Sequence, residues 1–493
     1  MNHNRFLKQI TDYLYCKSSV NRLQSKHQLN LRRKRMKLKK QLLAVVMIFV
    51  LSLSFTGCGD SSSQATEQET GQETTNDSNA NKDTQAFNIS SETTGEITVW
   101  DWNSAYEEKM YSHFQEVYPN IKVNYVTVAH GDYMQKLQSA IATGTDVPDI
   151  ILGEGAWRGK LFDMDILDNL EAEPYNLSRD DMFDYLVAGM SNARGEIVGV
   201  DQSIAPAGFA YKRDLALEYL GTDNPDEVYE HISSWDKFIE TGKKISEESN
   251  GSINMLPGFG DVLYATKGQT TQDYVDGDTI DITKRMSKAL ETAIKVRDAD
   301  IVGDNELDTP SWNAEFAENE TIFFPAAPWS CEWHVAANDP DGAGNWGLTK
   351  APESGYTKGG TSVGIYSKSE NKEAAFAYLQ WVYFSIDGSI VSRDVIGQYS
   401  SLKACYEGDN PIYNEAGAYD EFFGGQNLAK YFVEEIVPNI ESTQNESAYE
   451  TIVNEVFNKL NPTLSTDKTI TAEEAIELYK EEIAIKAMDA EVK

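Results

Sequence analysis

The stretch EITVWDW (Glu96–Trp102) begins the part of the sequence that decides the fold. Its β-branched and aromatic residues predict a buried strand. The next segment has apolar residues at helical spacing behind Ser104 and Glu107, which are spaced as in a capping box. The alternation continues with a predicted strand over 121–128, a helix over 132–143 and a strand over 148–154.

This order of strand, helix, strand, helix, strand predicts parallel pairing with right-handed crossovers, and therefore an α/β fold. In open sheets of this kind, ligands bind beyond the carboxyl ends of the strands. In this chain those ends are Trp100–Ser104 and Gly153–Trp157. The pattern alone therefore predicts a ligand site at these two stretches.

The charge of the chain is unevenly distributed. Residues 1–57 hold 12 Lys and Arg and one acid, whereas residues 58–493 hold 31 Lys and Arg against 77 Asp and Glu. An acidic surface repels phosphate backbones, so we expect no nucleic-acid partner. The histidines show no recognised metal-ligand spacing, and we expect neither a metal nor a cofactor.

The first 57 residues are typical of a lipoprotein signal peptide. Basic residues between Arg32 and Lys40 precede the apolar run LLAVVMIFVLSLSF (Leu42–Phe55), which suits a signal sequence better than a permanent membrane helix. The run ends in FTGC, which resembles a bacterial lipobox with Cys58 as the lipidated residue. The alternative is an ordinary secretory signal with a chance cysteine. The stretch from Met36 resembles a complete leader by itself, as expected if the start codon is assigned too early.

Residues 59–85 are polar and contain no aromatic residue. Such a segment cannot bury enough apolar surface to form a core, so 58–94 is predicted to be a disordered tether. The folded body is then expected at the extracytoplasmic face of a bacterial cell membrane, anchored through Cys58.

Five segments in a fixed order carry a resemblance to a known family. They are the region from EITVWDW to PDIIL (96–152), GEIVGVDQSIAPAGFAYKRDLALEYLG (195–221), SSWDKFIETGKKI (233–245), FAENETIFFPAAPW (316–329) and GLTKAPESGYTKGGTSVGIYSKSENKEAAFAYLQWV (347–382). The chain resembles the extracellular solute-binding proteins of ABC transporters, in the sugar-binding group that includes maltose-binding protein. The resemblance covers nearly all of residues 95–460.

The resemblance implies the two-lobed, type II periplasmic-binding-protein-like fold. Two α/β lobes would be joined by a hinge of two to three crossing strands, with the ligand cleft between them. Lobe one would hold 95–203 plus 362–400, and lobe two 204–361 plus 401–493. The C-terminal residues are predicted to be helical, and Thr471 with Glu474 forms a second capping box.

The same resemblance implies a function. The protein would be a substrate-binding lipoprotein, a monomer and not an enzyme, that delivers a neutral carbohydrate to the permease subunits of an ABC importer. An oligosaccharide is the expected ligand. The chain has no Gly-x-x-x-x-Gly-Lys-Ser/Thr motif, so the ATPase must be another chain.

Aromatic and polar residues are interleaved where a sugar could bind. A sugar ring has C–H groups on its faces and hydroxyls around its edge, so flat aromatics suit the faces, and carboxylates and amides suit the rim. Trp329, in FFPAAPWSCEWH (323–334), also matches the stacking position of the family. The alternative is that large aromatics at sheet edges simply cap the core. Trp235 and Trp381 lie inside amphipathic helices, and we expect them in the core or on a partly covered surface. The predicted ligand-binding residues are Trp102, Asn103, Glu154, Trp157, Asp201, Gln202, Phe259, Asp261, Trp329 and Gly360.

Two other functions stay open. A lipid-anchored glycoside hydrolase would use two of the many acids, and a binder of a polyamine or peptide would use the same aromatics and acids. GTSVG (Gly360–Gly364) matches the elbow of α/β-hydrolases, but that fold places a histidine after the serine, and the last histidine here is His334. The sequence does not identify the sugar.

Cys331 and Cys405 are the two cysteines of the predicted folded body. An extracytoplasmic setting permits a disulfide between them. Their separation in space cannot be derived from the sequence, so both the bonded and the free state remain open.

Overall fold

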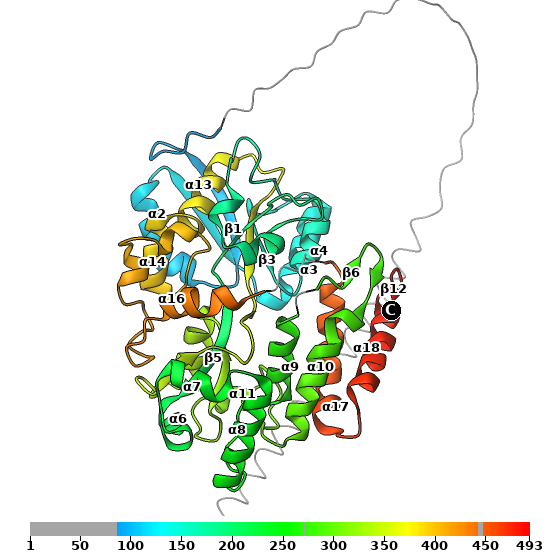
Figure 1. Ribbon diagram of the computed structural model, residues 1–493. Helices are drawn as coiled ribbons and strands as arrows, with labels where there is room; N and C mark the ends of the chain where they lie inside the picture. Colours follow the sequence, from blue (N-terminus) through cyan, green and yellow to red (C-terminus); the bar gives the residue numbers. More distant parts are fainter. Residues whose placement is uncertain (1–85, 271, 442–446) are drawn as a thin grey trace, which may run out of the picture. The chain divides into compact units, whose positions relative to one another are not determined.

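The structure is a computed structural model that describes residues 86–270, 272–441 and 447–493. The predicted leader, Cys58 and most of the predicted tether lie outside these residues. The described chain forms two lobes, each built on its own β-sheet and covered by helices (Figure 1). Within the described ranges, none of the helices is both long and apolar enough to cross a membrane.

The sheet of the first lobe has five strands in the order β2-β1-β3-β11-β4. Strand β1 pairs in parallel with β2 and β3, which confirms the predicted arrangement, and β11 runs antiparallel between β3 and β4. The strands are β1 (Gly95–Asp101), β2 (Ile121–Thr127), β3 (Ile150–Glu154), β4 (Val200–Asp201) and β11 (Thr361–Ile365).

Helices cover both faces of this sheet because their apolar residues meet those of the strands. Ile97, Val99 and Leu152 of the strands are fully buried, together with Phe114 and Leu137 of the helices. The helices of the lobe are α2 (Tyr111–Val117), α3 (Tyr133–Thr143), α4 (Arg158–Asp163), α5 (Asp184–Val187), α13 (Lys372–Tyr383) and α14 (Ile386–Ile396). Trp381 of α13 is buried as predicted.

The beginning of the first helix differs from the prediction. Asp101 Oδ1 accepts a hydrogen bond from the Asn103 N–H at 2.8 Å, and Asn103 Oδ1 accepts one from the Ala105 N–H at 2.9 Å. These two local turns organise the chain ahead of Ser104. The π-helical turn η1 (Tyr106–Met110) follows and leads into α2. The capping box predicted for Ser104 and Glu107 is therefore wrong.

The sheet of the second lobe is antiparallel and centred on β5. Strand β8 pairs with one edge of β5, and β9 and β10 pair with the other. Its strands are β5 (Pro206–Lys212), β8 (Phe323–Ala326), β9 (Trp346–Thr349) and β10 (Tyr356–Thr357). The helices around it are α6 (Arg213–Leu220), α7 (Pro225–Ile232), α8 (Trp235–Glu248), α9 (Phe259–Gly268), α10 (Ile282–Asp298), α11 (Pro310–Ala314) and α12 (Pro328–Ser330). Trp235 of α8 is buried in this core, as predicted.

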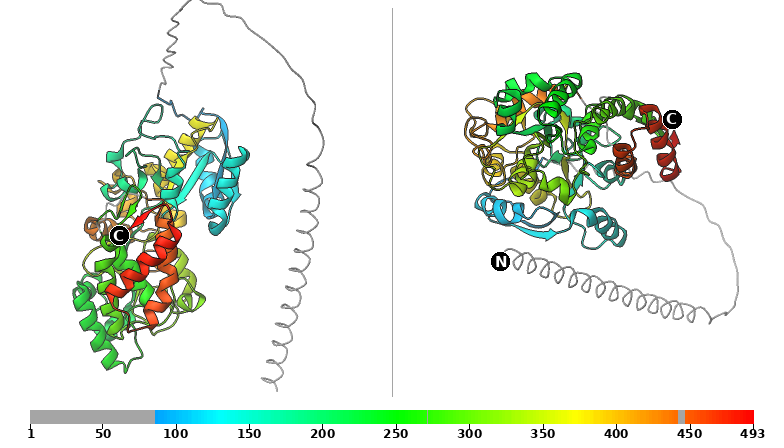
Figure 2. Two further views of the ribbon diagram at one scale, coloured as in Figure 1. Left: turned by 90° about the vertical axis from the view of Figure 1, so that its right-hand side faces the viewer. Right: turned by 90° about the horizontal axis from the view of Figure 1, so that it is seen from below.

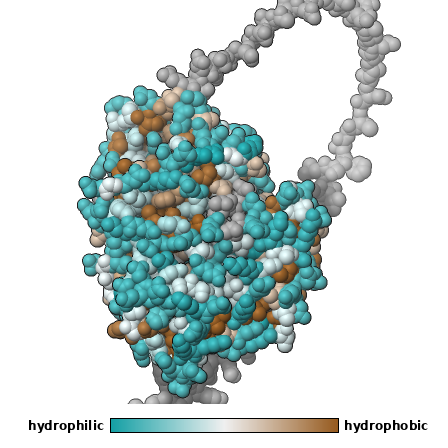
Figure 3. All heavy atoms as spheres, viewed as in Figure 1, coloured by the Kyte–Doolittle hydropathy of each residue, from teal (hydrophilic) through white to brown (hydrophobic). Residues whose placement is uncertain are grey.

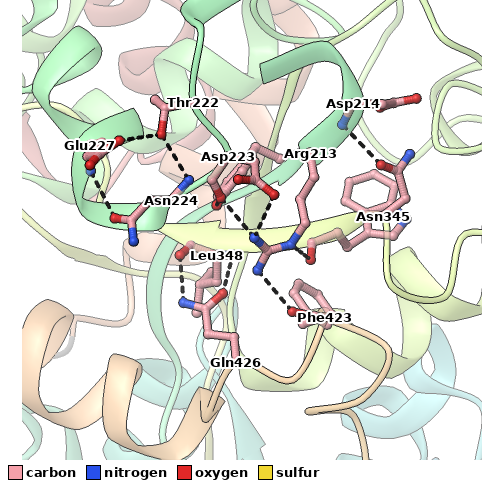
Figure 4. A network of polar contacts seen from close by, with 12 residues as sticks. Arg213, Asp214, Thr222, Asp223, Asn224, Glu227, Asn345, Leu348, Phe423 and Gln426 are labelled. Carbon is pink, nitrogen blue, oxygen red and sulfur yellow. Dashed lines mark hydrogen bonds and ion pairs between the residues drawn. The ribbon is translucent and has the colours of Figure 1, made fainter. Parts of the chain in front are cut away.

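Arg213 ties a distant loop to the end of this sheet. Its guanidinium donates hydrogen bonds to the carbonyls of Trp346, Asp223 and Phe423 at 2.8, 2.8 and 3.1 Å (Figure 4). Gln426 completes the link, because its amide pairs with both the N–H and the carbonyl of Leu348. The segment around 423–426 is thereby fixed against β9.

The C-terminal helices α17 (Glu450–Thr466) and α18 (Ala472–Lys486) lie side by side next to α10 (Figure 2). The predicted capping box of Thr471 and Glu474 begins α18 and is confirmed. Arg297 of α10 donates to the carbonyls of Leu464 and Ile470, which holds the turn between the two helices. A small sheet, β12-β7-β6, closes this region: β6 (Val275–Asp276), β7 (Thr279–Ile280) and β12 (Glu491–Val492).

A third cluster of buried residues lies at the junction of the lobes and contains both Cys331 and Cys405. Each is buried as a free thiol, so the structure has no disulfide between them.

The remaining short elements of the described chain are α15 (Pro411–Asn414), α16 (Leu428–Lys430), η2 (His130–Asp132), η3 (Arg179–Asp181), η4 (Ala188–Met190), η5 (Cys331–Ala336), η6 (Lys403–Tyr406), η7 (Tyr431–Ile436) and η8 (Val437–Asn439).

Three segments of the described chain connect the lobes: 202–205 between β4 and β5, 358–360 between β10 and β11, and 398–401 after α14. They are hydrogen-bonded to one another. Gln202 N–H donates to the Thr361 carbonyl at 2.7 Å, Lys358 N–H to that of Ala205 at 3.0 Å, and Ile204 N–H to that of Tyr399 at 2.9 Å. These crossing segments form the predicted hinge.

The surface view in Figure 3 is mainly hydrophilic, with small and scattered hydrophobic areas. This agrees with the acidic composition of the folded body. Among the large hydrophobic side chains that are exposed in the described residues is Trp333, which is 48% exposed and lies at the junction of the lobes.

Candidate ligand-binding cleft

A cavity lies between the carboxyl ends of β1 and β3 in the first lobe and α12 with η5 in the second. It has two chambers. The aromatic chamber, of about 500 Å³, is lined by Trp102, Asn103, Gln202, Trp329, Trp333 and His334, among others. The charged chamber, of about 540 Å³, is lined by Arg158, Asp201, Tyr264, Lys267, Lys358 and Glu450, among others. Six residues line both chambers and form their common wall: His130, Glu154, Asp308, Trp329, Gly359 and Gly360.

Trp102 is held in the aromatic chamber by other rings. Its ring centroid lies 5.1 Å from that of His130, 5.3 Å from that of Tyr133 and 5.7 Å from that of Trp157, each in an edge-to-face arrangement. Trp157 stacks on Tyr133 and does not line either chamber. Edge-to-face packing of this kind fixes the orientation of Trp102.

Trp329 is fixed from the side of the second lobe. Its indole Nε1–H donates to the Lys358 carbonyl at 2.8 Å, so the ring is attached to a crossing segment. The Lys358 ammonium lies 4.9 Å from the centre of the ring, and the His334 ring packs against Trp329 at 4.9 Å in an edge-to-face arrangement. Tyr264 holds the next residue of the same segment, because its hydroxyl accepts from the Gly359 N–H at 3.2 Å.

Buried carboxyl groups stand behind both chambers. Asp101 accepts a hydrogen bond from the Gln202 amide at 3.2 Å, and Asp201 accepts one from the Thr361 N–H at 3.2 Å. Burial raises the pKa of Asp101 to about 7, and it raises the pKa of Asp201 to about 7 against the opposing charge of Arg158. Burial also raises the pKa of Glu154, whose Oε2 accepts from the Ala156 N–H at 2.8 Å.

Three ionisable groups of the charged chamber form a network of their own. Lys267 donates to Asn454 Oδ1 at 2.5 Å, and the Lys267 and Arg285 cations each lie 3.8 Å from Glu450 Oε1. Burial acts to raise the pKa of Glu450, but Arg285 and Lys267 outweigh it and leave that pKa lowered. Burial lowers the pKa of Lys267 to about 8.

The predicted ligand-binding residues fall into two groups. The structure brings most of them to the cavity: Trp102, Asn103, Glu154, Asp201, Gln202, Trp329 and Gly360. Trp157 lies outside both chambers and packs edge-to-face against Trp102. Phe259 and Asp261 lie in the first turn of α9, where Phe259 joins the core of the second lobe and Asp261 accepts from the Trp312 indole N–H at 3.1 Å. The prediction that Phe259 and Asp261 line the ligand site therefore differs from the structure, in which both residues begin a buried helix and lie outside the two chambers.

The predicted site did not include the acid Glu450 or the cations of the charged chamber, Arg158, Lys267, Arg285 and Lys358. Lys358 had a usable signal, because it lies in TKGG within the segment predicted to cross between the lobes. The other charged residues of the chamber have no such signal in the sequence, because a charged residue in a helix is ordinarily solvated. No binding role is predicted for His334 from the sequence. It is instead a cavity residue whose pKa is lowered to about 3, first by burial and then by the nearby Lys358.

Two lobes, hydrogen-bonded crossing segments and a cavity lined from both sides define a hinged solute-binding protein. Residues 100–385 match the bacterial extracellular solute-binding protein family, and the chain belongs to that family. Membership confirms the class predicted from the sequence and implies an extracytoplasmic location.

Several relatives share the sequence or the fold. The chain is 25% identical over 368 residues to a lactose-binding protein of Rhizobium radiobacter, an alignment that covers 70% of this chain and 82% of that one. A solved extracellular solute-binding protein of family 1 superposes with a TM-score of 0.70 at 18% identity, over 80% of this chain and 99% of the other. The galacto-N-biose-/lacto-N-biose I-binding protein of Bifidobacterium longum superposes with a TM-score of 0.63 at 18% identity, over 81% and 99%. These likenesses confirm the predicted two-lobed fold.

Proposed function

We propose that this protein binds a carbohydrate in the cleft and delivers it to the permease of an ABC importer. One observation carries the proposal: Trp102 of the first lobe and Trp329 of the second line the same cavity, with the amides of Asn103 and Gln202 beside them. Indole faces suit the C–H faces of a sugar ring, and amides suit its hydroxyls. The lactose-binding relative, and the relative solved with lacto-N-biose, support the same ligand class.

An oligosaccharide is the favoured ligand because the cleft has two chambers with a common wall. Ligand cavities are typically about 300–1,000 Å³, and the two chambers of about 500 and 540 Å³ together reach the upper end of that range. A chain of sugars could place one unit in each chamber, with Trp329 and Glu154 between them.

The hinge gives this binding a mechanism. A ligand favours closure only through contacts that it gains in the closed form. Direct contacts between the lobes support a closed arrangement: Thr451 Oγ1 donates to the Ala156 carbonyl at 2.8 Å, and Lys109 Nζ lies 3.9 Å from Glu332 Oε1. In this proposal, residues 95–203 plus 362–400 form the first lobe, and residues 204–361 plus 401–493 form the second.

The test is a thermal-shift screen over mono- and oligosaccharides, because a ligand that binds only the folded state raises the melting temperature. Calorimetric titration then gives the stoichiometry, and mass spectrometry of the recovered sugar shows whether it is intact. One unchanged sugar per protein supports a binding protein. A cleaved sugar would favour the glycoside hydrolase, and a shift with polyamines or peptides alone would replace the ligand class.

The proposed anchor has its own test. If Cys58 carries the lipid, Cys58→Ala releases the protein from membranes into the soluble fraction, because the apolar attachment is lost. Fractionation of cells that express the parent or the variant measures this, with Cys331→Ala as the matched control that stays membrane-bound. A Cys58→Ala protein that still sediments with membranes contradicts the lipobox interpretation.

A further inference from the structure

The charged chamber collects buried cations in a protein with a large excess of acids. Seven lysines and arginines are buried in the described residues. Four of them line this one chamber: Arg158, Lys267, Arg285 and Lys358. Such a concentration requires compensating negative charge, because an uncompensated buried charge is costly.

Lys358 is not compensated as the other buried lysines are. Lys267 has Asn454 and Glu450, and Lys212 donates to the Glu318 carbonyl. Lys358 is 4% exposed, and in the described chain its ammonium has neither a hydrogen-bond acceptor nor an ion pair. It lies over two rings, 4.9 Å from the centre of Trp329 and 5.3 Å from that of Tyr264.

The acids of the chamber do not fill this gap. Glu154 accepts from a backbone N–H, Asp201 faces Arg158 and accepts from another, and Glu450 is shared by Lys267 and Arg285. Asp308 also lines the chamber, but its side chain is 67% exposed and solvated. Asp308, Asp261 and Glu154 attract the Lys358 ammonium, but none of them forms an ion pair with it in the described chain.

A second polar group in the chamber also lacks a partner. The hydroxyl of Tyr185 is buried, lines the same chamber and has no hydrogen-bond partner in the described part of the chain. A buried hydroxyl of this kind is suited to a ligand atom. A buried ammonium without an ion pair and an unpartnered hydroxyl in one chamber describe a position for an acidic group.

We propose that the charged chamber binds an acidic group of the sugar, a carboxylate or a sulfate ester, with Lys358 as its ion partner. The inference rests on the proposed carbohydrate function and deepens it. The ligand is then an acidic oligosaccharide, in place of the neutral one predicted from the sequence. Trp329 stacks on the sugar in the same cleft, and the acidic group meets the ammonium beside that ring.

The first experiment compares matched sugars with the unaltered protein. Disaccharides of galacturonic and glucuronic acid, and the 6-sulfates of galactose and glucose, are each titrated beside the neutral parent sugar. The methyl esters of the uronides remove the charge and keep the ring. An acidic member that binds at least about tenfold more tightly than its neutral parent and its ester supports the proposal, and the uronide and sulfate arms identify the source of the charge.

Failure of this proposal can be separated from failure of the carbohydrate function. Neutral parents that bind as tightly as the acidic sugars would overturn the acidic subsite and leave carbohydrate binding intact. If no sugar of either kind binds, both proposals are overturned.

The second experiment changes the protein. Lys358→Met keeps the apolar stem over Trp329 and removes the charge, so affinity for the acidic sugar falls about thirtyfold and that for the neutral parent less than about threefold. Lys358→Arg retains the preference. The matched control is Lys212→Met, because Lys212 is also buried, lies 5.5 Å from the centre of the Trp346 ring and is outside the cleft. It leaves both affinities unchanged.

Circular dichroism confirms that each variant is folded before titration. Equal losses for the acidic and the neutral sugar in Lys358→Met would mean that the lysine only positions Trp329, and this overturns the assignment. Should Lys358→Met fail to fold, the comparison of uronide with methyl ester in the unaltered protein decides the question.

Discussion

The aromatic and charged chambers differ in how their residues are assembled. In the aromatic chamber, Trp102 and Asn103 follow one strand directly, and local turns orient them. In the charged chamber, Arg158, Lys267 and Lys358 come from three distant parts of the chain and meet only in the folded protein. The first chamber supplies surface that suits many sugars. The second supplies charges that suit few sugars. We therefore expect affinity to depend mainly on the aromatic chamber and selectivity on the charged chamber.

The pH dependence of stability gives the largest expected effect and involves a carboxyl behind each chamber. The pKa of Asp101 and of Asp201 is raised from 3.8 to about 7 by burial. Between pH 4 and 7 the folded state therefore holds protons that the unfolded state has lost, and stability falls as the pH rises through this window. A pKa shift of this size changes the free energy of unfolding by roughly a few kcal/mol per carboxyl group. We expect a clearly higher melting temperature at pH 5 than at pH 8.

Thermal melts from pH 4 to 8 measure this slope. Asp201→Asn should flatten it, because the amide does not titrate. Asp409→Asn, a change of an exposed aspartate, is the control and should leave the slope unchanged. Equal slopes for the parent and Asp201→Asn would show that the carboxyl behind the charged chamber does not titrate in this window.

Trp329 belongs to both chambers, so its removal tests whether they act together. Trp329→Ala should cost about 2 kcal/mol of binding free energy, which is a loss of roughly thirtyfold in affinity. Because the ring lines both chambers, we expect the loss for acidic and neutral sugars alike. Calorimetric titration of the folded variant measures it.

Trp235→Ala is the matched control for Trp329→Ala. Trp235 is 3% exposed in the core of the second lobe. Its removal should lower stability by about 3 kcal/mol or more and leave the affinity of the folded fraction nearly unchanged. If the Trp329→Ala protein binds like the parent, Trp329 is a core residue and does not contact the ligand between the two chambers.

The smallest expected effect concerns Lys358 in the absence of ligand. A buried charge without a partner destabilises the folded state, whereas a buried apolar side chain of similar size does not. Lys358→Met should therefore raise the stability of the ligand-free protein, by about 1 kcal/mol. Lys212→Met should lower it, because the Glu318 carbonyl loses its donor. Melting curves without sugar compare the two, and a drop in stability for Lys358→Met would show that its two ring contacts already compensate the charge.

The sequence predicted the parts of the fold that depend on local pattern. Strands β1 to β3 and helix α3 follow from apolar periodicity, and the capping box of Thr471 from two residues three apart. The failed capping box at Ser104 has the same spacing. There Asp101 and Asn103 form turns first, and this competition cannot be recognised from spacing alone.

The candidate site could be predicted where residue type determines the role. Trp102 and Trp329 stand out because a large aromatic at a strand end or in an irregular segment has few uses. Lys267 and Glu450 could not be found in this way, since their pairing joins residues 183 positions apart. In a chain with 77 acids beyond residue 57, one more carboxylate in a helix carries no signal.

The place of β11 in the first sheet has a consequence for how the protein is made. This strand lies between β3 and β4, yet it is synthesised after the whole sheet of the second lobe. As the chain emerges residue by residue, the first lobe lacks an interior strand until residue 365 is free. We therefore expect the growing chain to stay without a finished first domain for most of its synthesis. Such a delay suits a polypeptide that must be threaded through a membrane before it folds.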